Sequence, residues 1–201
     1  VHLVHEPGGV SAITENGLET ASGASYDFDV IIYATGFDNG LIPFPVVGKD
    51  GVTLADRFGA SESNNFQMTD PETLWGIHVA DMPNFYMMIG PQSLNPVTNV
   101  TLLCEEQSKY IASIVSEMKK DGYCEVEPKQ EAVARWSKKC SETAEGKVWL
   151  RCNNWYTKST KTDEKAGRQR SRLMWMESYE TYLRNLIGGE EGARNEHLRF
   201  S

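Results

Sequence analysis

Apolar residues recur at helical spacing between residues 96 and 121. Five of them keep the i, i+3, i+4, i+7 pattern that forms one face of a helix: Leu103, Ile111, Ile114, Val115 and Met118. Asn95 is a suitable N-cap with Pro96 at the first helical position, and Asp121-Gly122 is a suitable end. The pattern predicts a long amphipathic helix whose free backbone N–H groups lie near residues 96–99. These N–H groups could bind an anionic group, or the segment could be a well-capped helix and no more.

Other segments also have helical patterns. Residues 128–143 predict a more polar helix with Trp136 on its apolar face, and residues 173–187 predict a packed helix. Residues 53–57 could form a single helical turn. We expect the charged residues 190–201 to be a frayed tail.

Short β-prone runs alternate with turn signals in the first half of the chain. They predict strands over residues 1–4, 10–14, 18–20, 30–33, 74–78 and 85–89. Asn16-Gly17 is a strong hairpin signal. The predicted strand over 30–33 ends at Ala34-Thr35-Gly36, three small residues that let a ligand approach the backbone closely. A buried strand followed by an ordinary turn explains the same residues equally well.

Composition limits the classes of function. The chain has 201 residues, 40% of them hydrophobic and 24% charged, which is ordinary for one domain or one and a half. A net charge of -8 argues against nucleic acid and gives no support for binding an anionic membrane. The sequence has neither a signal-peptide pattern nor a long apolar run, so we expect a cytoplasmic protein without a membrane partner.

The metal-ligating residue types are scattered along the chain. The four cysteines form no Cys-x-x-Cys pair, and the four histidines do not cluster, so no metal site is predicted. His78 follows an apolar stretch, and we expect it to be a core histidine rather than a catalyst.

Three motifs occur in a specific order along the chain: Tyr33-Ala-Thr-Gly-Phe-Asp38, Pro83-Asn-Phe-Tyr-Met-Met-Ile-Gly-Pro-Gln-Ser93 and Trp155-Tyr-Thr157. Together they resemble the carboxyl-terminal part of a Baeyer–Villiger monooxygenase, a flavoprotein with two dinucleotide-binding domains. The resemblance implies an α/β fold of short strands and about three helices. Residues 1–38 would then be the end of the NADPH-binding domain and its crossover strand. Residues 39–201 would be the carboxyl-terminal half of the FAD-binding domain with the terminal helices.

The resemblance also implies a reaction and its cofactors. NADPH reduces FAD, and an oxygen atom from O2 is inserted next to a ketone to give an ester or a lactone. The start of the helix near residues 96–99 would face the flavin. The cofactor-binding residues implied are Ala34, Thr35, Gly36, Phe37, Asp38, Gly90, Pro91, Ser93, Thr98, Asn99 and Trp155. Catalytic residues are expected upstream of the chain.

Several family features are missing. The chain contains neither Gly-x-Gly-x-x-Gly phosphate loop, and Gln92 stands where the family has a small residue. The Gly and Asn expected after Trp155-Tyr156 are replaced by Lys158 and Thr160. We therefore expect a chain that is incomplete as an enzyme. Two alternatives remain open: an N- or S-oxygenating flavin monooxygenase of the same architecture, and a non-catalytic remnant that acts only as a binding module.

Overall fold

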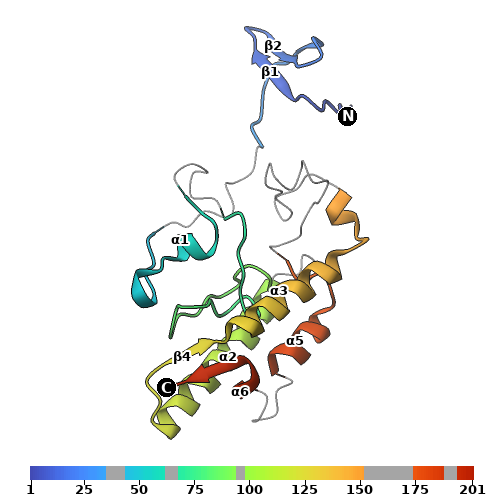
Figure 1. Cartoon of the computed structure of the whole chain (residues 1–201). Helices are drawn as coiled ribbons and strands as arrows, with labels where there is room; N and C mark the ends of the chain where they lie inside the picture. The colour runs from blue at the N-terminus through green and yellow to red at the C-terminus, as the bar shows by residue number, and fades with distance from the viewer. Residues whose placement is uncertain (35–43, 62–67, 94–97, 152–173, 188–193) are drawn as a thin grey trace. The chain divides into compact units, whose positions relative to one another are not determined.

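The structure is a computed structural model that describes residues 1–34, 44–61, 68–93, 98–151, 174–187 and 194–201 (Figure 1). The chain divides into two compact units, Val1–Asp38 and Asn39–Ser201, and each is described by itself. The assignment of these units to the NADPH-binding and FAD-binding domains of an enzyme stays a prediction.

The first unit is a three-stranded antiparallel sheet. The strands β1 (Val10–Ile13), β2 (Gly17–Thr20) and β3 (Ser25–Asp27) are neighbours in chain order. Ile13 pairs with Leu18 across the turn over residues 14–16, and Gly17 is the first residue of β2; the predicted hairpin is confirmed. The register shifts between Val10 and Ala12, a bulge in the edge strand.

Two predicted strands of this unit are wrong. Residues 1–4 and 30–33 have no strand pairing, although their side chains favour strands. Ile32 is 84% exposed and Tyr33 is 68% exposed, so the second segment is also not buried. A strand forms only where another strand satisfies its backbone groups, and within the described residues no such neighbour lies beside either segment.

The second unit begins with short helical turns. The 3-10 turn η1 (Lys49–Gly51) precedes α1 (Leu54–Arg57), which confirms the helical turn predicted over 53–57. The Thr53 hydroxyl accepts from the Asp56 N–H at 3.1 Å, and the Asp56 carboxylate accepts from the Thr53 N–H at 2.9 Å. This capping box explains why so short a helix is formed. Leu54 then packs in a small core with Phe58, Val79 and Met82.

The long helix α2 (Val100–Asp121) confirms the main helix prediction and corrects its start. Asn99, not Asn95, is the N-cap, and Gly122 ends the helix in the left-handed conformation at φ 78°. The buried residues are Leu103, Gln107, Tyr110, Ile114 and Met118. Val115 was expected on the same face but is exposed, because one residue further along a helix turns the side chain about 100° away.

The last third of the chain folds back onto α2. It contains β4 (Val126–Pro128), α3 (Gln130–Ala144), the 3-10 turn η3 (Val148–Arg151), α5 (Tyr179–Ile187), α6 (Arg194–His197) and β5 (Leu198–Phe200). Trp136 lies on the buried face of α3, as predicted, but the helix begins two residues late because Pro128 belongs to β4. Trp175 is fully buried but lies before α5, so the predicted helix over 173–187 is shorter.

The expected frayed tail is wrong for residues 194–201; residues 190–193 of that prediction lie outside the described residues. β5 pairs antiparallel with β4, and Leu198 is almost fully buried. The prediction relied on the charged residues of this segment. One buried apolar side chain, Leu198, and the pairing with β4 hold the segment in place.

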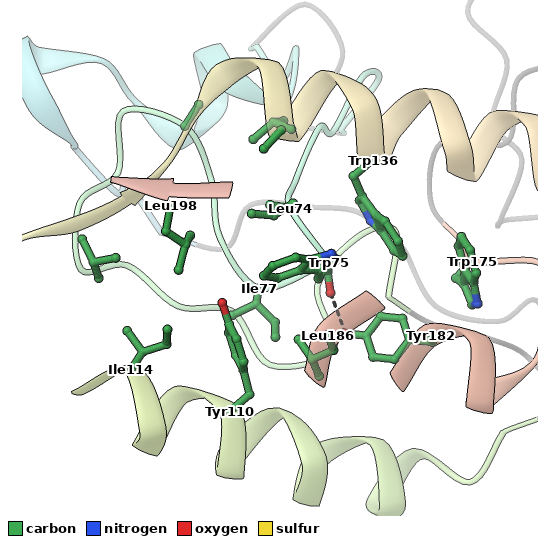
Figure 2. Close-up of a cluster of buried hydrophobic side chains, with 14 of the residues drawn as sticks. Leu74, Trp75, Ile77, Tyr110, Ile114, Trp136, Trp175, Tyr182, Leu186 and Leu198 are labelled. Atoms are coloured by element: carbon green, nitrogen blue, oxygen red, sulfur yellow. Dashed lines mark hydrogen bonds between the residues drawn. The ribbon is translucent and has the colours of Figure 1, made fainter. Parts of the chain in front are cut away.

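The main core lies between α2, α3 and α5 (Figure 2). Trp136 of α3 stacks on Trp175 with ring centroids 4.7 Å apart. The segment 74–89 also enters this core, but its two predicted strands are wrong: only an isolated bridge joins Leu74 and His78. Trp75, Asp81, Asn84 and Ile89 have positive φ, which interrupts any extended run.

Candidate functional site

The Gly90–Ser93 motif forms a buried turn. The Gly90 N–H donates to the Gly76 carbonyl at 3.1 Å, and a Cβ on Gly90 would collide with that same oxygen. The Ser93 hydroxyl donates to the Gly90 carbonyl at 2.7 Å and is 1% exposed. The hydroxyl thus closes the turn from inside, and contact of Ser93 with a cofactor stays a prediction. Gly90 is required by the close approach of two backbones.

The first turn of α2 combines free backbone donors with exposed apolar side chains. The Asn99 side-chain oxygen accepts from the Thr101 N–H at 3.0 Å and from its hydroxyl at 2.6 Å. The first turn holds no acidic residue, so no carboxylate neutralises the positive end of the helix. Val100 and Leu102 are both exposed beside these N–H groups. A flat apolar ring with a negatively charged polar edge matches this arrangement.

A buried amide links this helix to the turn. Gln107 Oε1 accepts from the Ile89 N–H at 2.9 Å, directly before Gly90. Gln107 Nε2 donates to the Tyr182 hydroxyl at 2.8 Å, which in turn donates to the Trp75 carbonyl at 2.6 Å (dashed line in Figure 2). The chain of bonds therefore joins α2, α5 and both ends of the segment 75–89.

A second buried amide holds the other end of the turn. Gln92 Oε1 accepts from the Thr73 N–H at 2.9 Å, and Gln92 Nε2 donates to the Ser137 hydroxyl of α3 at 3.0 Å. The Thr73 hydroxyl donates to the Pro91 carbonyl at 2.8 Å. Gln92, which departs from the family pattern, thus points inward and not toward a ligand.

His78 lies in the same core and is neutral near pH 7. It is 1% exposed, and its Nε2 lies 2.9 Å from the Tyr110 hydroxyl. Burial lowers the pKa of His78 to about 3, because charging the ring without water around it is unfavourable. Its neighbours Tyr86 and Tyr110 pack edge-on against it. The prediction of a core histidine is confirmed.

The predicted site residues fall into three groups. Gly90, Pro91 and Ser93 share one buried turn, and Thr98 and Asn99 lie at the start of α2 in the same unit. Ala34 is exposed in the first unit. The remaining five lie outside the described residues: Thr35, Gly36, Phe37, Asp38 and Trp155.

Sequence reasoning missed Gln107 as a central residue of this site. Its signal was available, because Gln107 occupies an apolar-face position between Leu103 and Tyr110 of the predicted helix. A polar side chain on such a face must find partners inside the protein. The identity of those partners, Ile89 and Tyr182, has no trace in the sequence.

Two classes of site find no support among the described residues. Across those ranges, no three His, Cys, Asp or Glu side chains gather in a way that could hold a metal ion. Within the same ranges, no helix has both the length and the apolar character needed to cross a membrane.

Comparisons with known proteins give consistent relatives, although no family model matches the chain. It is 32% identical over 164 residues to a 2-oxo-Δ3-4,5,5-trimethylcyclopentenylacetyl-CoA monooxygenase of Pseudomonas putida, covering 80% of this chain and 28% of that protein. It is 30% identical over 149 residues to a Baeyer–Villiger monooxygenase of Pseudooceanicola batsensis, covering 73% and 25%. The chain is related to Baeyer–Villiger monooxygenases.

A solved structure of this group shares the fold. The crystal structure of the OTEMO complex with FAD and NADP matches 96% of this chain and 34% of its own, with a TM-score of 0.71 and 28% identity. The resemblance to Baeyer–Villiger monooxygenases and the mixed helix-and-strand fold of these flavoproteins are thereby confirmed. The chain spans about a quarter of the length of the curated relatives named above.

Proposed function

We propose that this chain is the carboxyl-terminal part of an FAD- and NADPH-dependent Baeyer–Villiger monooxygenase that converts a ketone and O2 to an ester or a lactone. In this proposal residues 1–38 end the NADPH-binding domain and residues 39–201 complete the FAD-binding domain. The relatives support the class of enzyme. The observation that carries the role of this chain is the first turn of α2, which lacks acidic residues and lies in the same unit as the Gly90–Ser93 turn.

The residues present fit one end of a flavin. Thr98, Asn99 and the N–H groups that open α2 would hold the polar edge of the ring, and Val100 and Leu102 offer it an apolar surface. The positive end of a helix carries roughly half an elementary charge, which stabilises negative charge on the reduced ring. FAD, when bound, supplies the two-electron chemistry that activates O2.

The residues present do not fit the other end of FAD. Diphosphates are held by glycine-rich loops at helix N-termini, and the 201 residues contain no Gly-x-Gly-x-x-Gly. Because the ring side is present and the diphosphate side is not, we expect this chain to bind riboflavin and FAD with similar affinity, within about threefold.

Titration of the 201-residue chain with riboflavin and with FAD, followed by flavin fluorescence, tests the proposal. Equal and saturable binding is expected. The Val100→Asp variant places a carboxylate in the first turn of α2 and should bind reduced riboflavin about tenfold more weakly, although an acid there stabilises the helix itself. Binding of the reduced form is measured by anaerobic titration calorimetry, because reduced flavin has almost no fluorescence. Val115→Asp is the matched control, since Val115 is equally exposed on the same helix but far from its start.

Two results would contradict the proposal. Absence of binding by either flavin would contradict the proposed contact between this chain and the flavin ring. Equal effects of the two aspartate variants would show that the start of α2 does not contact the ring. The activity itself is tested by NADPH oxidation with a ketone, in a chain that also carries the two glycine-rich loops.

A further inference from the structure

The turn that precedes α2 has a strained backbone. Ile89 has φ 55° and Gln92 has φ 70°, in the left-handed region that side chains rarely adopt. A β-branched residue such as Ile89 is an outlier there, and such conformations persist only where surrounding contacts impose them. The contacts that impose this conformation are therefore of interest for the function of the turn.

Gln107, on α2, holds Ile89 in this left-handed conformation. Its side chain is fully buried, and its Oε1 is the acceptor for the Ile89 N–H at 2.9 Å. Its Nε2 is anchored by the Tyr182 hydroxyl, so the amide cannot rotate without losing a second bond. Two turns of helix separate Gln107 from the start of α2, so one rigid element carries both the acceptor and the predicted flavin contact.

The Gln92 side chain holds the other end of the turn against α3. It is 2% exposed and bonds to Thr73 on one side and to Ser137 on the other. The Cys140 thiol also points to the Gln92 carbonyl at 3.8 Å. The turn is thus held at both ends by amide side chains that face away from solvent.

We propose that Gln107 and Gln92 are positioning residues that clamp the Ile89–Ser93 turn between α2 and α3, so that the turn backbone and the start of α2 contact the flavin ring together. This role rests on the proposed function. Neither glutamine touches the ring; each acts through the backbone that it holds. The clamp predicts that the turn loosens locally when one amide is lost, while the helices stay intact.

Native-state amide hydrogen exchange of the 201-residue chain tests the clamp without any cofactor. In Gln107→Leu the amide hydrogens of Gly90 and Ser93 should exchange about tenfold faster with solvent. The substitution removes the acceptor of the Ile89 N–H, and Ile89 begins the turn that contains both amides. Their own acceptors, the carbonyls of Gly76 and Gly90, are untouched by the substitution. Amides in the middle of α2 should keep their wild-type rates.

Tyr110→Phe is the matched control. It removes a buried hydrogen bond of the same helix, the one to His78 Nε2, but leaves both side-chain bonds of Gln107 in place. It should lower the midpoint of urea unfolding without accelerating Gly90 or Ser93. Should Gln107→Leu fail to fold, Gln92→Met replaces it, with the Gly90 and Ser93 amides as reporters. Equal acceleration in α2 and in the turn would overturn the clamp, as would equal effects of the Gln107 and Tyr110 variants.

Riboflavin affinity separates the clamp from the flavin site. Under conditions in which all variants are folded, Gln107→Leu should weaken riboflavin binding about tenfold and Tyr110→Phe by less than about twofold. A wild-type chain that binds no riboflavin would contradict the proposed function, and the exchange rates would then still decide whether the turn is clamped. Loosened exchange with unchanged affinity would overturn the positioning role.

Discussion

Replacing His78 by Gln should remove a specific dependence of stability on pH. His78 is neutral in the folded protein because burial lowers its pKa to about 3, whereas an unfolded chain has the ordinary histidine value of about 6.5. Between these two values the unfolded chain binds a proton that the folded protein does not. Acid therefore favours unfolding, and the stability linked to His78 is complete above about pH 6.5 and falls as the pH drops toward 3.

The magnitude follows from the two pKa values. At pH 5 the unfolded histidine is almost fully protonated, and the folded one almost not at all. The free energy of unfolding should then be about 2 kcal/mol lower at pH 5 than at pH 7 because of this residue alone. His197 has its pKa lowered mainly by burial and acts in the same direction, but it is present in both proteins and cancels from the comparison.

Urea unfolding at pH 7, 6 and 5, followed by tryptophan fluorescence, measures the difference. A Gln side chain can still bond to the Tyr110 hydroxyl, so the variant keeps the hydrogen bond that the His78 side chain makes to Tyr110. The wild type should lose about 2 kcal/mol more than His78→Gln over this range. Equal losses would refute the assignment of a buried, neutral His78.

Three further predictions concern stability, each measured by urea unfolding at pH 7. Asn99→Ala removes the side-chain cap of α2 and should cost about 1 kcal/mol, whereas Ser116→Ala in the same helix should cost much less. Gly90→Ala forces a Cβ against the Gly76 carbonyl and should cost about 1–3 kcal/mol; a neutral result would show that the two turns are not in contact. Leu198→Ala should cost about 2–5 kcal/mol if β5 is part of the core, and almost nothing if the segment were frayed.

Local signals predicted the helices well. The end of α2 follows from Lys119, Lys120 and Gly122, which suit the dipole and the left-handed cap without help from the rest of the fold. The hairpin between β1 and β2 was equally accessible, because Asn16-Gly17 favours a tight turn and only residues 14–16 join the two strands. In both elements the decisive contacts lie within a few residues of each other.

Elements that need a distant partner were not predictable. Leu198–Phe200 is a strand only because β4, some seventy residues earlier, offers its edge. Residues 30–33 have a better strand composition but no strand partner among the described residues, and Val30, Ile32 and Tyr33 are exposed. Composition alone therefore favours a strand over residues 30–33 more than over residues 198–200, the opposite of what the structure shows. Strand formation depends on which backbone groups come together to form hydrogen bonds.

The Gly90–Ser93 turn belongs to the motifs that carry the family resemblance, and a residue in such a motif can have a structural role. The contact of Gly90, Pro91 and Ser93 with a cofactor stays a prediction; in the structure all three residues are buried, and the Ser93 hydroxyl bonds to the turn itself. The Gln92 side chain is also buried, and its Oε1 accepts from the Thr73 N–H. The shape of the turn is therefore one reason for these residue types. If the clamp by Gln107 is correct, a residue outside the motif determines what the motif can bind.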